Sequence, residues 1–110
     1  MSFNADLGLE SAADGSVRLE AGPRHQVAPG TVHFAVLATL AEVAAAAAVG
    51  AAVVPATVQL NLMRRAAPGE LVGRGTVLKR GRTLAVAEGE VTQEGRLVAK
   101  ATVTFAVLEG

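Results

Sequence analysis

Glu42 is the residue whose type and surroundings most strongly suggest chemistry. It is the only charged side chain between His33 and Arg64, and the stretch around it is apolar. An ionised carboxylate there is unfavourable unless it is paired, hydrogen-bonded or open to a water-filled cleft. One interpretation is a general base or nucleophile in an apolar pocket, where desolvation raises the carboxyl pKa towards neutrality. The other is a glutamate on the exposed stripe of an amphipathic helix. On a helix, Thr39 and Ala46 would share the face of Glu42. The helix contains almost no other polar residue, which weakens the interpretation as an exposed polar stripe.

The predicted start of this helix is a second candidate. His33 lies there, directly after Gly30, Thr31 and Val32. Free backbone N–H groups at a helix N-terminus suit a developing oxyanion, and a nearby histidine could orient the loop. The alternative is a histidine that only caps or packs the helix end.

Basic residues follow in the second half of the chain at Arg64, Arg65, Lys79, Arg80 and Arg82. They could bind the phosphates of a nucleotide-bearing substrate, or they could simply solvate turns. Other chemistries lack their motifs, because no glycine-rich phosphate loop opens a helix and no His/Asp/Glu spacing suits a metal. The serines all lie near the N-terminus, which disfavours a Ser-His-Asp triad. We expect no metal and no cofactor.

Composition excludes several classes of function. The chain has 110 residues, and its 10 Lys and Arg balance 10 Asp and Glu. This length predicts a single domain over residues 1–110. A nucleic-acid partner is disfavoured by the neutral charge and by the absence of Trp and Tyr. The absence of cysteine excludes disulfides and thiol nucleophiles, and it is consistent with a reducing cytoplasm, where we expect the protein. The first residues lack the pattern of a secretory signal.

The apolar content is high but consists largely of small side chains. Hydrophobic residues make up 51% of the chain, and the mean hydropathy is +0.40. Because small side chains bury little area, an additional interface is expected, which predicts an oligomer. The longest apolar stretch, 36–54, contains Thr39, Glu42 and Gly50. We therefore expect a buried core helix there and no membrane span.

The secondary structure that must position these residues is predicted as one helix followed by strands. The helix spans His33–Val49, with Thr31 as a possible N-cap and Gly50 as C-cap. Before it, Leu7–Ala21 predicts a weak hairpin around Asp14-Gly15, and residues 22–30 predict an irregular loop. After it, alternating apolar residues predict four strands within 57–64, 71–78, 84–93 and 98–108. The fold class is α+β, with the helix packed on one face of an antiparallel sheet.

Six short segments follow one another in an informative order: Gly30–Ala35, Leu40–Glu42, Thr57–Arg64, Pro68–Glu70, Lys79–Arg82 and Gly95–Ala99. Together they resemble the hotdog-fold acyl-CoA thioesterases of the phenylacetate-pathway (PaaI-like) type, over roughly Pro23–Leu108. That family has Gly-x-x-His-Gly-Gly at the start of its central helix and an acidic residue nine positions after the His. A Thr-bearing strand, a basic-Gly-Arg turn and Gly-(Arg/Lys)-x-x-Ala follow.

The resemblance implies a sheet wrapped around the central helix, and homodimers or homotetramers with active sites at the subunit interface. It implies that Glu42 attacks the thioester carbonyl or activates water, while the Phe34 N–H, supported by His33, polarises the carbonyl oxygen. The substrate-binding positions it implies are Gln26, Val27, Thr57, Arg64, Arg80, Gly81 and Arg82. The expected activity is hydrolysis of a small or aromatic acyl-CoA to the free acid and coenzyme A.

The chain departs from the family pattern at several positions. Phe34 and Ala35 replace the two glycines after the histidine, and Ala46 stands where several relatives carry Ser or Thr. The loop position that often holds Asn or Gln is either Gln26 or Val27. These departures favour, as the alternative, a non-catalytic acyl-CoA-binding or assembly module on the same fold. A hotdog-type hydratase lacks its His and acid arrangement here.

Overall fold

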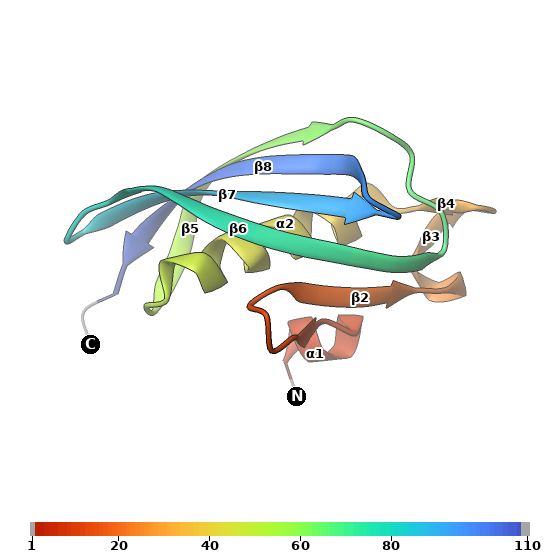
Figure 1. Ribbon diagram of the computed structural model, residues 1–110, viewed down its shortest axis with the longest axis horizontal. Coiled ribbons are helices and arrows are strands. Elements are labelled where there is room, and N and C mark those ends of the chain that lie inside the picture. Colours follow the sequence, from red (N-terminus) through yellow and green to blue (C-terminus); the bar gives the residue numbers. More distant parts are fainter. Residues whose placement is uncertain (1, 109–110) are drawn as a thin grey trace.

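One long helix crosses one face of an antiparallel sheet (Figure 1). The structure is a computed structural model and describes residues 2–108. Its elements are α1 (Phe3–Leu7), β1 (Glu10–Ser11), β2 (Val17–Ala21), a 3₁₀ turn (Pro23–His25), β3 (Gln26–Ala28), β4 (Thr31–Val32), α2 (Phe34–Val49), β5 (Val53–Leu62), β6 (Gly69–Arg80), β7 (Leu84–Gln93) and β8 (Arg96–Val107). The larger sheet has the strand order β1-β2-β6-β7-β8-β5, and β3 pairs with β4 separately. The predicted α+β class is confirmed.

The backbone of α2 lies directly against β6 and β7. Glycine faces the helix at Gly75 and Gly89, where a Cβ atom would overlap the carbonyl groups of Ala44 and Ala41 respectively. At these points the strand backbone therefore lies directly against the backbone of α2, with no side chain from the strand between them. The alanine-rich sequence of α2 is therefore a packing requirement and not merely a helix-forming preference.

Both ends of α2 are closed by specific groups. At the C-terminus, Gly50 has the left-handed conformation expected of the predicted C-cap, with φ 72°. At the N-terminus the cap is His33, whose Nδ1 accepts a hydrogen bond from the Ala35 N–H at 3.0 Å. The prediction of Thr31 as N-cap is wrong, because Thr31 is already extended and pairs with Ala28 in the β3–β4 ladder.

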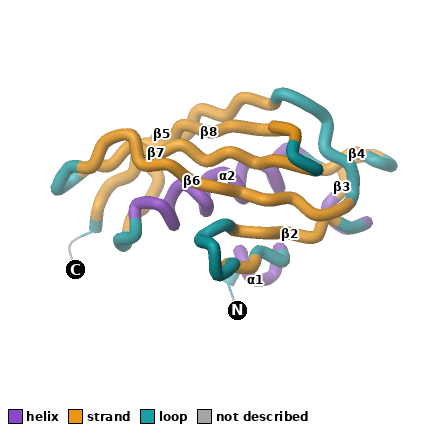
Figure 2. The backbone as a smooth tube through the Cα atoms, in the orientation of Figure 1, coloured by secondary structure: helices purple, strands orange, loops and turns teal. Residues whose placement is uncertain are grey.

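The N-terminal segment differs from the predicted hairpin. Leu7 ends a short helix, α1, which begins with the Ser2 side chain accepting a hydrogen bond from the Ala5 N–H. The hairpin is shorter than predicted and pairs β1 with β2. Its loop is also wider than a two-residue turn, since the Ala12 N–H donates to the Ser16 carbonyl. Figure 2 shows α1 next to β2, at the edge of the sheet that this hairpin forms.

Two further boundaries are corrected by the structure. The segment predicted as an irregular loop, 22–30, contains the 3₁₀ turn and β3. The strand after α2 starts at Val53 and so includes Pro55, because β5 is an edge strand and its ladder shifts register between Pro55 and Thr57. Proline is tolerated at such positions since its missing N–H interrupts no inner ladder.

The predicted alternation of the last strand is confirmed. Ala99, Ala101, Val103 and Phe105 are fully buried against the helix side of the sheet. Lys100, Thr102 and Thr104 alternate with them and are half-buried on the opposite side. Within the described residues, no helix is long and apolar enough to cross a membrane.

We predict that Gly89→Ala destabilises the protein by about 3 kcal/mol, at the upper end of typical overpacking costs, because its Cβ must displace the α2 backbone. The matched control is Gly22→Ala, since no atom lies within 4 Å of a Cβ built at Gly22. Urea unfolding followed by circular dichroism compares the two variants with the parent. Equal midpoints for Gly89→Ala and the parent would contradict the close approach.

Candidate active site

The N-terminus of α2 presents one free backbone donor. Phe34 is the first helical residue, so its N–H has no partner inside the helix. The next amide, that of Ala35, is taken by the His33 side chain. The His33 N–H in turn donates to the His25 carbonyl at 2.8 Å, which fixes the cap against the 3₁₀ turn. The capping role of His33 thus takes the Ala35 N–H and leaves the Phe34 N–H without a partner inside the helix.

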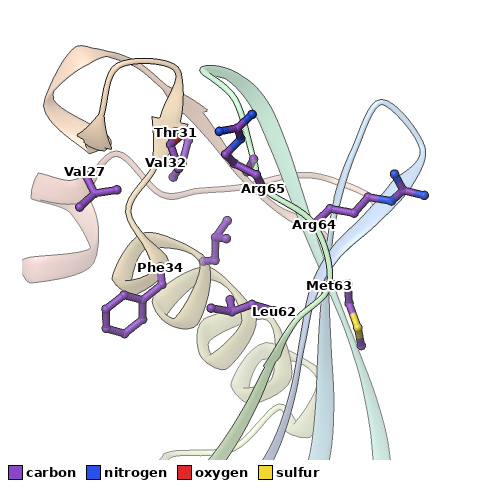
Figure 3. Close-up of a pocket in the computed structure, with 10 residues that line it drawn as sticks. Val27, Thr31, Val32, Phe34, Leu62, Met63, Arg64 and Arg65 are labelled. Carbon is purple, nitrogen blue, oxygen red and sulfur yellow. The ribbon is translucent and has the colours of Figure 1, made fainter.

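An apolar pocket of about 400 Å³ opens beside this donor (Figure 3). Its lining comes from three parts of the chain: Val27, Thr31 and Val32; Phe34 and Leu37; and Leu62, Met63, Arg64, Arg65 and Ala66. The side chains of Val27 and Phe34 are 61% and 56% exposed. The Phe34 ring stacks on the His33 imidazole with centroids 4.9 Å apart. The structure therefore brings Val27, Phe34 and Arg64 of the predicted set together.

The β3–β4 loop settles which of Gln26 and Val27 faces this pocket. The Gln26 Oε1 accepts a hydrogen bond from the Gly30 N–H at 2.6 Å, so its side chain braces the loop. Gly30 has φ 79°, a conformation that suits glycine at the tip. Val27 consequently lines the pocket and offers no polar contact.

Glu42 lies two turns along α2 from this donor, on the helix face that points away from the sheet. Thr39 and Ala46 share this face, as predicted, and all three residues are half-buried. Within residues 2–108, no basic side chain lies within salt-bridge distance of the Glu42 carboxylate. Burial raises the pKa of the Glu42 carboxyl above its ordinary value. The structure thus places a desolvated carboxylate without a cationic partner on an open face.

The other predicted substrate-binding residues lie elsewhere in the chain. Thr57 is exposed on β5, opposite Thr104 of β8. Arg80, Gly81 and Arg82 belong to the β6–β7 turn, and the Arg80 Nη1 donates to the Val49 carbonyl at 2.9 Å. This contact places the turn at the C-terminal end of α2, opposite the pocket. Within one chain, these residues do not converge with Phe34.

A second, polar cavity adjoins the apolar pocket. It is lined by Arg64, Arg65, Ala67, Gln93, Glu94, Arg96 and Val98. The predicted substrate-binding set contains neither Arg65 nor Arg96. The Gly95–Ala99 segment indicates that Arg96 follows a turn. Sequence reasoning missed its position in this cavity because nothing in the sequence indicates that the 63–68 connection lies against that turn. Within the described residues, no group of three potential metal ligands occurs.

The sequence of this chain matches the model of a known protein family. Residues 23–106 match the acyl-CoA thioesterase N-terminal domain family. The chain belongs to this family. A search of curated proteins found no match.

Solved structures confirm the hotdog fold and the PaaI-like resemblance. A conserved protein from Pseudomonas aeruginosa is 30% identical with a TM-score of 0.88, over 98% of this chain and 94% of its own. A variant of the phenylacetic acid degradation protein PaaI from Thermus thermophilus is 30% identical with a TM-score of 0.85, over 96% and 98%. A Bacillus halodurans protein, whose structure contains CoA, is 28% identical with a TM-score of 0.82, over 91% and 71%.

We predict that Glu42→Gln stabilises the folded chain at neutral pH. Because folding raises the pKa of Glu42, its stabilising contribution is present below the unfolded-state pKa and is lost as pH rises through the folded-state value. The neutral amide avoids this loss, so the Tm of the variant should exceed that of the parent at pH 7.5 and match it near pH 4. Thermal unfolding followed by circular dichroism measures both. Glu10→Gln, on the exposed strand β1, is the control and should show no such gain.

Proposed function

We propose that this protein hydrolyses an acyl-CoA thioester to the free acid and coenzyme A, with Glu42 as general base or nucleophile. The observation that carries this proposal is the half-buried Glu42 carboxylate on α2 of a thioesterase-family chain, which has no cationic partner within residues 2–108. Such a group is costly to fold, which is typical of a reacting residue. The free Phe34 N–H supplies the complementary donor for developing negative charge.

Two routes are compatible with this pair of groups. In one, the Glu42 carboxylate takes a proton from water, whose oxygen attacks the carbonyl carbon. In the other, a carboxylate oxygen attacks directly and forms an anhydride that water then cleaves. In both, the Phe34 N–H stabilises the oxyanion and the carbon–sulfur bond breaks to release the thiolate. In the first route the thiolate takes the proton that Glu42 removed from water, and in the second it takes the proton that water releases when it cleaves the anhydride.

The spacing along α2 favours a site shared between two copies of the chain. Phe34 and Glu42 are eight residues apart on one straight helix, which separates them by about 12 Å along the axis. A reacting thioester must lie within about 3 Å of both groups. One chain cannot meet this condition, whereas the Glu42 of one copy can face the Phe34 N–H of another.

Strand β5 is suited to join such copies. It is ten residues long, forms an edge of the larger sheet, and pairs on one side only, with β8. Val58 and Leu62 on its helix side are about half exposed. A long exposed apolar edge is a template for pairing with another strand. The opposite edge strand, β1, has only two residues. These features support a homodimer built edge to edge through β5, which can pair further into a homotetramer.

The acyl group is proposed to be small or aromatic. The Phe34 side chain occupies a position that is bare glycine in the family pattern, and it narrows the apolar pocket from one side. Met63 also lines this pocket, whereas Phe105 lies in the core and cannot affect its depth. A flat or short acyl group suits the remaining space.

The same Phe34 favours the second candidate, a non-catalytic acyl-CoA-binding module. Its exposed ring can obstruct the donor, and Ala46 offers no hydroxyl to hold a water molecule near Glu42. This candidate predicts saturable binding of acyl-CoA without thiol release.

We predict that Glu42→Ala lowers kcat for the best acyl-CoA by on the order of 10²–10⁴-fold. Thiol release from a panel of CoA thioesters, from acetyl to long-chain and including benzoyl and phenylacetyl, identifies that substrate. For the parent, kcat/KM should rise with pH through the raised pKa of Glu42, because only the carboxylate reacts. Equal rates for parent and Glu42→Ala would exclude the proposed role, and binding without release from any ester would favour the module.

We predict that two inactive variants restore activity when mixed. Phe34→Pro removes the donor N–H, and proline suits the first helical position after an extended His33. Random pairing with Glu42→Gln chains leaves one intact site in each mixed dimer, which gives about a quarter of parent activity. The two variants are mixed in denaturant and refolded together, with light scattering as a check of assembly. Phe34→Ala, which keeps the N–H, is the control. No recovery in mixed dimers would show that each site lies within one chain.

A further inference from the structure

His25 is a buried titratable residue that the proposed mechanism does not use. It ends the 3₁₀ turn Pro23–His25, is 5% exposed, and does not line the apolar pocket. Among the polar and charged residues that the structure describes, only Ser16 is also buried. Burying an imidazole is unfavourable unless its nitrogens are hydrogen-bonded, so the partners of His25 indicate what the side chain holds in place.

Both ring nitrogens of His25 have a partner. The Nδ1 atom accepts a hydrogen bond from the Gly22 N–H at 2.9 Å. The Nε2 atom lies 2.8 Å from the Leu7 carbonyl oxygen. A carbonyl oxygen can only accept, so Nε2 carries the proton and donates, while Nδ1 keeps its lone pair for Gly22. The surroundings therefore select one tautomer of the neutral ring.

The contact to Leu7 attaches the end of α1 to the 3₁₀ turn. Leu7 is the last residue of α1, so its carbonyl has no partner inside that helix. Arg24 reaches the same end, because its Nη1 donates to the Asp6 carbonyl and its Nη2 to the Leu7 carbonyl, at 2.6 and 3.0 Å. The attachment of α1 is thus shared by two side chains, of which His25 is one.

The contact to Gly22 has no such second side chain. The His25 N–H donates to the Gly22 carbonyl at 3.0 Å, and the Gly22 N–H donates back to the His25 ring. This reciprocal pair closes the 3₁₀ turn. A three-residue turn of this kind has weak hydrogen bonds of its own, so its shape depends on the side chain that closes it.

The carbonyl of His25 connects this turn to the start of α2. It accepts the hydrogen bond of the His33 N–H at 2.8 Å. Peptide planes are rigid, so only the φ and ψ angles of His33 separate this N–H from the Phe34 N–H. The direction of the Phe34 N–H therefore depends on the direction of the His25 carbonyl, which the bond to Gly22 sets.

We propose that His25 is a positioning residue for the Phe34 N–H and acts through its bond to Gly22. The inference rests on the proposed function, because it takes this N–H as the oxyanion donor. His25 contacts no reacting atom. Full negative charge on the carbonyl oxygen develops only in the transition state, so a misdirected donor lowers kcat and leaves KM unchanged.

The test compares His25→Asn with His25→Gln. The shorter amide can place an oxygen near the Nδ1 position and accept from Gly22, whereas the longer one can place its NH₂ near the Nε2 position and donate to Leu7. Each variant loses one contact of a buried ring, so both should lower the Tm by similar amounts. We expect His25→Asn to keep the parent kcat and His25→Gln to lose it about tenfold, less than removal of an oxyanion donor.

Arg24→Gln is the matched control, since it weakens the attachment of α1 without touching the Gly22 contact. Its kcat should equal that of the parent, and KM for the best acyl-CoA should be unchanged in all three variants. Equal losses of kcat in His25→Asn and His25→Gln would indicate a merely structural role and overturn the proposal. A parent-level kcat in His25→Gln would overturn it as well.

NMR spectroscopy tests the geometry without any activity. The imidazole ¹⁵N shifts of the neutral parent should show a protonated Nε2 and an unprotonated Nδ1 for His25. The chain has only two histidines, so His33→Asn assigns the signals. A protonated Nδ1 contradicts the contact to Gly22, and this measurement requires only the folded parent.

The Phe34 amide signal separates this inference from the proposed function. If the parent hydrolyses no thioester, but this signal shifts in His25→Gln and not in His25→Asn, the positioning contact stands and the hydrolase proposal fails. If hydrolysis requires Glu42 while the signal and kcat of His25→Gln match those of the parent, the hydrolase proposal stands and the positioning role fails.

Discussion

The contact between the α2 backbone and the glycines of β6 and β7 is the constraint on which the rest of the molecule depends. Gly75 and Gly89 let the sheet approach until the carbonyls of Ala44 and Ala41 touch the strands. At these two points no strand side chain fits between the layers and the helix carries alanine, whereas Leu40 on the same side of the helix packs next to Gly73 of β6. The opposite side of the helix then carries the only charge, Glu42, away from the sheet. The proposed catalytic carboxylate and the packing contacts therefore lie on different faces of one helix.

The surroundings of the helix start are assembled from irregular segments that side chains hold in place. His33 closes the helix, Gln26 braces the β3–β4 loop, and Gln93 holds the connection after β5. Each contact satisfies backbone groups that no strand or helix would satisfy, which explains how loops can present a defined surface. The apolar pocket and the polar cavity meet at the 63–68 connection, while α2 and β5 supply Phe34, Leu37 and Leu62 to the pocket wall.

Sequence periodicity was sufficient to predict α2, the four strands after it and the isolation of Glu42, because those features depend on local residue order. It could not predict α1, whose five residues carry no apolar period. The sequence predicted Thr31 as the N-cap because threonine is a favourable N-cap residue. In the structure Thr31 is extended and pairs with Ala28, and His33 is the N-cap. Arg64 and Arg96 line one cavity because of the strand order, so neither residue's neighbours in the sequence could reveal it. The separation of the β6–β7 turn from the pocket has the same origin.

The hydrogen bond from Arg80 to the Val49 carbonyl also shapes the electric field of the molecule. Aligned peptide dipoles give a helix a positive N-terminal pole and a negative C-terminal pole. Arg80 places a full positive charge on the negative pole of α2, while the first turn contains no acidic residue to offset the positive one. Although the net charge of the chain is zero, the positive pole of α2 is left without an acidic residue beside it, and this pole lies at the mouth of the pocket. A field of this kind attracts anions to that end of a molecule, and added salt weakens the attraction.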